Sequence, residues 1–120
     1  MKQIGKINVL GTEYEVLMSN ETLDKKLKDK AGYTDWSAKR ICLDEDNLTK
    51  DKDSLENLHL YANKVLRHEI VHAFMEESGL SDQYHNETIV EWIAKMAPKI
   101  LECANTIVFT EKDIKEEAGV

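Results

Sequence analysis

Two histidines four positions apart, with a glutamate directly after the first, are the residues of this sequence best suited to chemistry. They stand in the stretch His68-Glu69-Ile70-Val71-His72. If this stretch is helical, both imidazoles lie on one face about one turn apart, where their ring nitrogens can reach a single metal ion. In this H-E-x-x-H arrangement neutral imidazoles hold zinc and the glutamate acts as general base. The spacing therefore predicts a zinc site at which Glu69 activates water.

A structural cluster of histidine and glutamate is the alternative, because a chain with many glutamates produces the same spacing by chance. The residues before the motif favour the metal. Leu58, Ala62 and Val65 recur at helical spacing, and their stripe continues into Glu69 and His72. The ionisable side chains then extend a buried face, where an unpartnered carboxylate is unfavourable and a bound cation removes the difficulty.

A zinc hydrolase needs a third protein ligand and leaves the fourth position to water. Gly79 predicts the end of the motif helix, and Asn86 the start of a second helix. The three-histidine pattern H-E-x-x-H-x-x-G-x-x-H is excluded, since Met75 and Ser78 occupy its glycine and its last histidine. The remaining candidates for the third ligand are Glu87, Glu91 and, as an unconventional ligand, His85.

On these residues the chain resembles the gluzincin metallopeptidases, specifically the small phage and prophage proteins of that class and the ImmA/IrrE-like peptidases. Gluzincins carry the third ligand on the following helix, within N-E-x-x-x-D, and residues 86 to 91, NETIVE, match that motif with Glu for the final Asp. The resemblance covers roughly residues 39 to 101. It implies Glu87 as the zinc ligand and Glu91 as the acceptor that orients His68, with an exchange of roles left open by the longer Glu91 side chain.

The resemblance also implies the reaction class, which is that of a zinc metalloendopeptidase acting on a peptide or protein substrate. Zinc polarises the scissile carbonyl and lowers the pKa of its water, while Glu69 takes the proton and passes it to the departing amine. The 120 residues hold no counterpart of the C-terminal subdomain that gives larger gluzincins a His or Tyr for the oxyanion. Tyr84 and His85, between the two helices, are the candidates for that role, or else ordinary surface residues.

The chain before the motif predicts a small antiparallel sheet packed on the two helices, so the expected fold is α+β and zincin-like. Residues 4 to 18 form a predicted β-hairpin that turns at Gly11, and residues 39 to 43 a predicted third strand. That strand is either an ordinary core strand or an exposed edge that receives a substrate peptide by backbone pairing.

Polar stretches connect these elements. A short exposed helix anchored by Leu23 and Leu27 is expected after the hairpin. Residues 44 to 54 are expected to form a loop, at the end of which Asp53 or Ser54 caps the motif helix.

Two long helices are expected to carry the site. The first runs from about residue 55 to residue 78 and holds the H-E-x-x-H in its second half. The second starts near Asn86, and on its wheel the two carboxylates border a broad apolar arc. Pro98, the only proline, should kink this helix or split it in two. The charged tail after Phe109 should be frayed or weakly docked.

Length and composition describe one soluble domain. At 120 residues, with 42% hydrophobic and 32% charged residues, the chain is long enough for a single modest core. The formal net charge of −7 argues against nucleic-acid binding. No apolar run approaches the length of a membrane span, and the first residues lack the apolar core of a signal peptide. We therefore expect a cytoplasmic protein without a membrane partner, while the oligomeric state is left open.

The two cysteines, Cys42 and Cys103, fit no metal-ligand spacing. Each sits in an apolar run, so buried free thiols are expected, with a disulfide or zinc ligation as alternatives.

Two hypotheses compete with the peptidase. In the first, zinc is a staple for a small domain with little or no catalytic activity. In the second, the chain is a phage or prophage regulatory protein that acts by binding a partner, and the motif is a relic. Glu69 separates the peptidase from the staple, because a structural zinc ion needs no base beside it.

Overall fold

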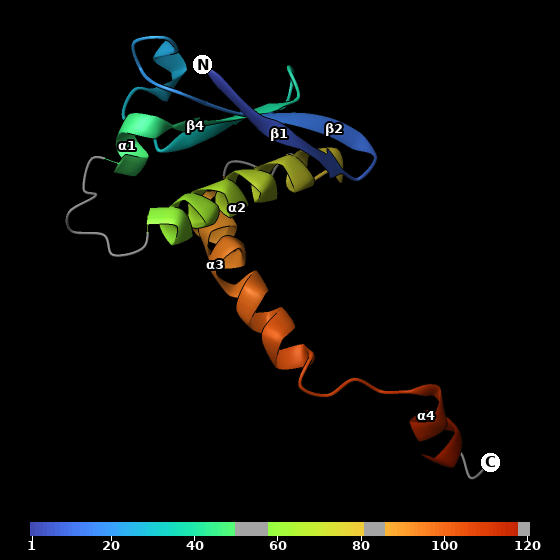
Figure 1. Ribbon diagram of the computed structural model, residues 1–120. Helices are drawn as coiled ribbons and strands as arrows, with labels where there is room; N and C mark the ends of the chain where they lie inside the picture. The colour runs from blue at the N-terminus through green and yellow to red at the C-terminus, as the bar shows by residue number, and fades with distance from the viewer. Residues whose placement is uncertain (50–57, 81–85, 118–120) are drawn as a thin grey trace.

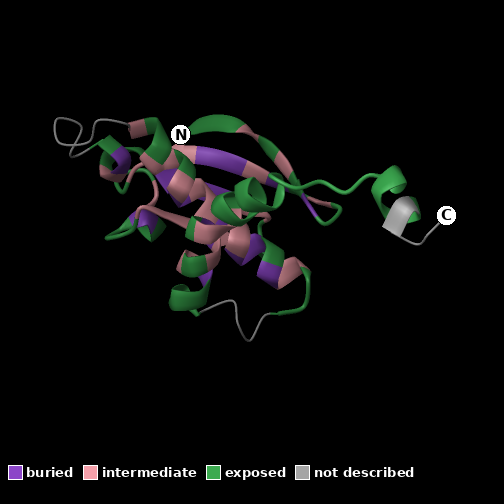
Figure 2. Ribbon diagram, turned by 90° about the horizontal axis from the view of Figure 1, so that it is seen from below, coloured by how far each residue is buried: buried purple, intermediate pink, exposed green. Residues whose placement is uncertain are grey.

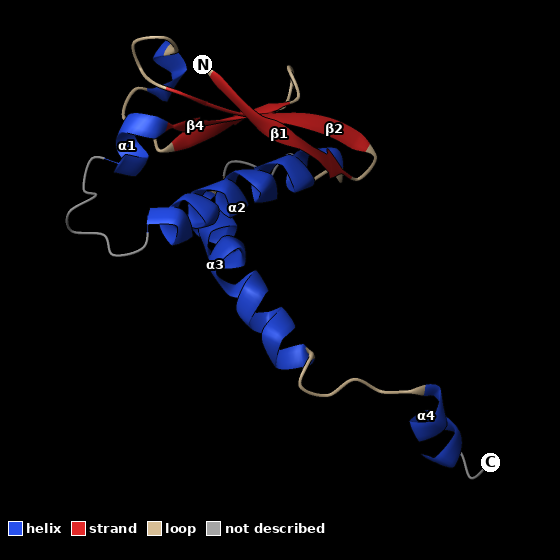
Figure 3. Cartoon of the chain, in the orientation of Figure 1, coloured by secondary structure: helices blue, strands red, loops and turns tan. Residues whose placement is uncertain are grey.

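The computed structural model describes residues 1–49, 58–80 and 86–117 of the chain. In these ranges four strands come first and the long helices follow, with the first long helix laid across one face of the sheet (Figure 1 and Figure 3). The predicted α+β class is therefore confirmed. None of the described helices is long and apolar enough to cross a membrane.

The sheet is mixed, with the strand order β1-β2-β4-β3. Its strands are β1 (Lys2–Val9), β2 (Thr12–Ser19), β3 (Gly32–Asp35) and β4 (Arg40–Asp44). The predicted β1–β2 hairpin is confirmed, and Gly11 in its turn has a φ of 92°, which glycine adopts without steric penalty. The prediction of an antiparallel sheet is wrong for one pair, because β2 and β4 run parallel. The chain crosses over after β2 and forms β3 first, so β4 returns in the direction of β2.

The third predicted strand, over residues 39 to 43, is β4, and it lies inside the sheet between β2 and β3. It is a core strand and not an exposed edge, since Ile41 and Cys42 are fully buried. One of the two edges is formed by β3, a strand that the sequence did not predict, and the other by β1. Gly32 and Asp35 mark the two ends of β3. Because both residue types are depleted in strands, the sequence pattern did not indicate a strand here.

The short helix expected after the hairpin is a single 3-10 turn, η1 (Lys25–Leu27). Leu27 is fully buried and anchors the turn as predicted, whereas Leu23 is exposed. The Asp24 carboxylate caps the turn by accepting a hydrogen bond from the Lys26 amide at 3.1 Å.

The stretch expected to be a polar loop begins with a helix, α1 (Glu45–Thr49). Its one large apolar residue, Leu48, is buried in the core. A single apolar residue among polar ones gives no helical periodicity, so the sequence did not predict this helix. The proposed caps Asp53 and Ser54 lie outside the described residues.

The helix α2 (Leu58–Glu77) is the predicted motif helix. Its expected buried stripe is confirmed, because Val65, Glu69 and His72 are all buried. The core that it covers contains Val9, Tyr14, Val16, Ile41, Leu43, Leu48, Val65 and Ala73. Gly79 ends the helix as predicted, with a φ of 85°.

The helix α3 (Glu87–Ala104) starts where the sequence predicts, with the Asn86 side chain accepting the Ile89 amide at 3.1 Å. Of the kink or split expected at Pro98, the split is wrong, because the helix continues through this residue. Proline has no N–H to donate to the Ala94 carbonyl one turn earlier. That oxygen accepts a hydrogen bond from Arg67 Nε at 3.1 Å instead, which leaves it satisfied and ties α3 to α2.

Beyond Ala97 the chain leaves the body of the protein, and every residue from 98 to 115 is exposed (Figure 2). Past Phe109, where a frayed or weakly docked tail was expected, it forms α4 (Glu111–Glu117) at the far end. Both cysteines are free thiols, as predicted. Cys42 is buried, but the prediction of a buried Cys103 is wrong because the second half of α3 projects into solvent.

Gly32→Ala should lower the free energy of unfolding by about 1–2 kcal/mol, through overpacking. A Cβ at this position would lie 2.9 Å from Leu43 Cδ2, 3.0 Å from the Cys42 carbonyl oxygen and 3.5 Å from Val65 Cγ1. Gly5→Ala is the matched control, since nothing lies within 4 Å of the corresponding Cβ. Urea unfolding of both variants measures the difference, and equal stabilities would contradict the tight packing of Gly32 against Leu43 and Cys42 of β4.

Candidate metal centre

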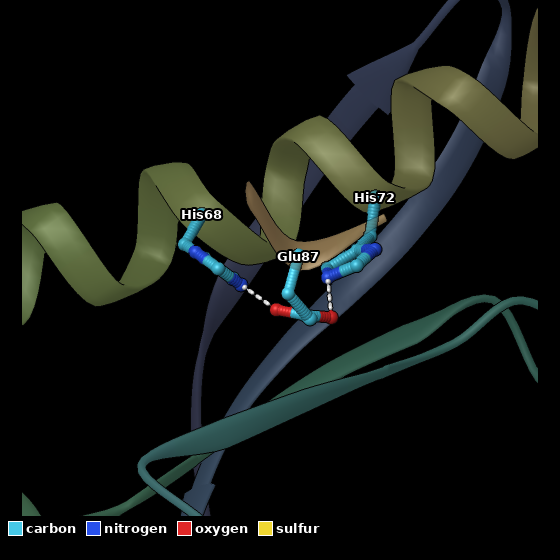
Figure 4. Close-up of side chains that lie close together, drawn as sticks. All are labelled: His68, His72 and Glu87. Atoms are coloured by element: carbon cyan, nitrogen blue, oxygen red, sulfur yellow. Dashed lines mark hydrogen bonds and ion pairs between the residues drawn. The ribbon is translucent and has the colours of Figure 1, made fainter. Parts of the chain in front are cut away.

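The side chains of His68 and His72 converge with that of Glu87, at the start of α3, on one small volume (Figure 4). His68 Nε2 lies 2.8 Å from Glu87 Oε2, and His72 Nε2 lies 2.9 Å from Glu87 Oε1. One ligand atom from each of the three residues falls within 4.8 Å of the other two. The ring centres are 5.1 Å apart. The predicted convergence of both imidazoles and a carboxylate from the later helix is thus observed.

Glu91 contacts the other nitrogen of His68. Its Oε2 lies 3.2 Å from His68 Nδ1, and its Oε1 lies 3.9 Å from Lys64 Nζ. Glu87 and Glu91 are one turn apart on α3, so this helix presents one carboxylate to each nitrogen of the His68 ring. Glu87 therefore lies on the side shared with His72, and Glu91 lies behind His68.

The groups around the two ring nitrogens of His68 indicate whether a metal ion fits this site. Each of them faces a carboxylate oxygen, but a neutral imidazole has only one N–H to donate. The contact with Glu87 needs a proton or a cation between Nε2 and the carboxylate, whereas the 3.2 Å contact of Nδ1 with Glu91 lacks hydrogen-bond geometry. A cation at Nε2 lets a neutral ring carry its one proton on Nδ1, on the side of Glu91. Two imidazole nitrogens and a carboxylate oxygen are ligands that zinc takes. The donor set fits zinc.

Glu69 lies beside the two histidines and is only 7% exposed. The Thr34 hydroxyl, on the edge strand β3, lies 2.9 Å from Glu69 Oε1 and 2.8 Å from the Glu69 backbone carbonyl oxygen. Burial raises the pKa of the Glu69 carboxyl, and the Thr34 hydroxyl and the two imidazoles oppose that rise. A carboxyl whose pKa is raised towards neutrality is suited to accept and return a proton.

A cavity of about 560 Å³ opens in front of these groups. Its walls come from β3 and the residues before it, from α2 and from the first turns of α3. The residues that line it are Lys30, Ala31, Gly32, Tyr33, Thr34, Tyr61, Lys64, Val65, His68, Glu69, His72, Glu87 and Glu91. The three potential ligands, Glu69 and the edge strand β3 therefore share one cavity.

Packing between α2 and α3 sets the position of the carboxylates. Val90 and Ala94 are almost fully buried, and Arg67 on α2 donates to the Ala94 carbonyl. Glu87 is three residues before Val90 and Glu91 three before Ala94, so each carboxylate lies nearly one turn from an anchoring contact. The site depends on this helix pair more than on any loop among the described residues.

The structure brings together five of the predicted site residues: His68, Glu69, His72, Glu87 and Glu91. The predicted oxyanion candidates Tyr84 and His85 lie outside the described residues.

Three site residues were missed from the sequence. Thr34 had no local signal, because it lies 35 residues from its partner Glu69. Lys64 and Tyr61, by contrast, precede His68 by four and seven positions, and this spacing could have placed both on the same face of α2. Tyr61 packs against the core and also lines the cavity.

No family model, curated protein or solved structure matches this chain. The gluzincin resemblance therefore stays a prediction from the motifs.

Thr34→Val should destabilise the metal-free protein by about 2 kcal/mol, because it removes the hydroxyl that holds a buried carboxylate. Valine keeps the shape and the strand propensity of threonine. Thr34→Ser, which retains the hydroxyl, is the control and should recover most of the loss. Urea denaturation at neutral pH measures both variants. If valine and serine give the same stability, the Thr34–Glu69 hydrogen bond has no energetic role.

Proposed function

We propose that the chain is a zinc-dependent metallopeptidase that hydrolyses peptide bonds, with Glu69 as general base. The observation that carries the proposal is the pair of carboxylates around His68, with Glu87 at Nε2 and Glu91 at Nδ1. A cation at Nε2 would satisfy the contact with Glu87 and let a neutral ring carry its proton on Nδ1, next to Glu91, and His72 Nε2 faces the same Glu87 carboxylate. The buried Glu69 beside this cluster has no purpose in a purely structural zinc site.

His68, His72 and Glu87 would hold the ion, and Glu91 would orient His68 by accepting its Nδ1 proton. A partner of this kind fixes the tautomer and makes the ligating nitrogen more basic. Lys64 lies behind Glu91 and partly balances its charge. Zinc bound by these residues would supply Lewis acidity, which polarises the scissile carbonyl and makes water a stronger nucleophile.

Glu69 would take a proton from the attacking water and deliver it to the nitrogen of the departing amine. The Thr34 hydroxyl keeps the Glu69 side chain in one orientation, so the carboxyl is positioned before the substrate arrives. Because the pKa of this carboxyl is raised, its proton affinity lies closer to those of the attacking water and the departing amine, between which it would transfer the proton.

A peptide substrate would lie along the edge strand β3. This strand is paired with β4 on one side only, and three of its residues, Gly32 to Thr34, line the cavity. Backbone pairing with an extended peptide would bring a scissile bond near Glu69 without requiring a particular side chain.

A zinc-stabilised regulatory or interaction protein with little activity is the second candidate, and one observation favours it. The two tyrosines of the cavity already have hydrogen-bond partners, since the Tyr33 hydroxyl donates to Asp24 at 2.5 Å and the Tyr61 hydroxyl to Asn47 at 3.1 Å. Neither is therefore poised to stabilise an oxyanion. A protein of this kind would bind zinc and leave peptides intact.

The test is to incubate the zinc-loaded chain with a complex mixture of peptides and to search for new termini by mass spectrometry. Cleavage that stops with a chelator and returns with zinc supports the peptidase. Zinc bound at one ion per chain without any cleavage supports the second candidate. A chain that takes up no zinc contradicts both.

A further inference from the structure

The helix α3 has two apolar stripes, and only one of them packs on the body of the protein. The first stripe contains Val90 and Ala94, which are buried against α2. The second is turned away from them by about a quarter of the helix circumference. It recurs at spacings of four and three residues, as in a coiled-coil seam, and consists of Ile89, Ile93, Met96, Ile100 and Cys103.

The second half of α3 projects from the body (Figure 1), and the stripe residues in that half, Ile100 and Cys103, are exposed. Ile100 is 54% exposed, and Trp92, next to the stripe, is 58% exposed. Directly after the helix come Ile107, Val108 and Phe109, all of them largely exposed. We call this surface, the stripe with Trp92 and residues 107–109, the α3 arm.

The area of the α3 arm matches the requirement of a stable interface. A large apolar side chain has roughly 200 Å² of surface, so the exposed fractions of Ile89, Trp92, Ile100, Ile107, Val108 and Phe109 amount to on the order of 700 Å². A standard interface buries about 800 Å² on each partner. Apolar patches of this size on a soluble chain mark contact surfaces.

We propose that the α3 arm pairs two copies of this chain, with their α3 helices antiparallel about Pro98. On either side of Pro98 the nearest stripe residues lie two and five positions away, so the spacing is the same in both directions. In this register Met96 faces Ile100 of the second copy, and Ile93 faces its Cys103. One patch then serves both chains, as a two-fold interface requires.

The antiparallel direction follows from the shape of the protein. The first half of α3 lies on the body, and the second half projects from it (Figure 1). Antiparallel pairing lays the projecting half of each copy over the exposed stripe on the first half of the other, so residues 107–109 reach Ile89 and Trp92. A parallel pair would bring the two bodies against each other.

The charge of the chain disfavours a membrane as the occupant. The net charge is −7, and Glu111 and Asp113 follow the arm directly. Anionic lipid surfaces attract basic segments and repel acidic ones. A second copy carries no such restriction, because the acidic ends of two antiparallel arms lie at opposite ends of the pair.

The mass of the full chain in solution tests the pairing. At about 100 µM, light scattering should give twice the chain mass of 13.8 kDa. Ile100→Glu should raise the dissociation constant by about 10- to 100-fold, because it places a charge in the seam. Leu101→Glu is the matched control: Leu101 is 62% exposed but is turned about 100° from Ile100 round α3, in line with Val90 and Ala94 and outside the seam, so the dimer should remain. If the wild-type chain is monomeric, the proposal is wrong, and the α3 arm is then a contact surface for a partner of different sequence.

A disulfide cross-link tests the direction. In the antiparallel register Ile93→Cys lies opposite Cys103 of the second copy, so mild oxidation should produce a covalent dimer joined at positions 93 and 103. Cys42 is buried and should not react. Peptide mapping identifies the bond. A link between two copies of Cys103, formed equally well in the unmodified chain, overturns the antiparallel arrangement. Neither readout depends on zinc or on catalysis, so this proposal and the proposed peptidase activity stand or fall separately.

Discussion

Glu69→Gln is expected to reduce peptide hydrolysis by about 10²- to 10⁴-fold, because it removes the group that takes the proton from water. The zinc content should stay at one ion per chain, since Glu69 is not among the three convergent ligand residues. The amide oxygen of glutamine can still accept the Thr34 hydroxyl, so the fold around the residue should persist. The rate is measured on a peptide that the wild-type chain cleaves, and the zinc content by elemental analysis of the same sample.

Glu76→Gln is the matched control, on the same helix two turns further along and outside the cavity. It should leave both rate and zinc content unchanged. An unaltered rate in Glu69→Gln would remove the general base from the mechanism. Loss of zinc in that variant would instead make Glu69 a ligand, against the geometry described above.

Glu87→Ala is expected to weaken zinc binding by about 10³-fold, because it deletes one of three protein ligands. Glu91→Ala should weaken it by only about 10- to 100-fold, the usual effect of losing a group that orients a ligating histidine. The difference follows from their contacts: Glu87 faces the Nε2 atoms of both histidines, whereas Glu91 faces only His68 Nδ1 and Lys64. Competition with a chromophoric chelator measures each affinity.

Glu102→Ala, exposed on the same helix, is the control and should bind zinc as the wild type does. The reverse order of effects, with Glu91→Ala the weaker binder, would exchange the two roles. Equal and negligible effects of both would mean that the cluster is held by hydrogen bonds alone. In that case zinc should also fail to raise the melting temperature of the wild-type chain.

The sequence was most informative where the relevant contacts are local. The hairpin turn, the Asn86 cap, the helix end at Gly79 and the alignment of both histidines each depend on residues at most four positions apart. Glu87 was assigned from a family motif whose spacing is also local. The helix α1 was missed for the opposite reason. Its residue Leu48 is held by contacts with core residues that are distant in the sequence.

By itself, the sequence determined that two imidazoles and a glutamate lie along one helix and that two carboxylates begin the next, because helix periodicity places side chains without reference to the rest of the fold. Only the tertiary structure decided which carboxylate faces which nitrogen of His68, that β3 is the edge strand, and that Thr34 holds Glu69. It also decided that the second half of α3 is left uncovered. These features arise from contacts between segments far apart in the chain, whose pairing depends on how the sheet and both helices pack together, and no local spacing encodes that packing.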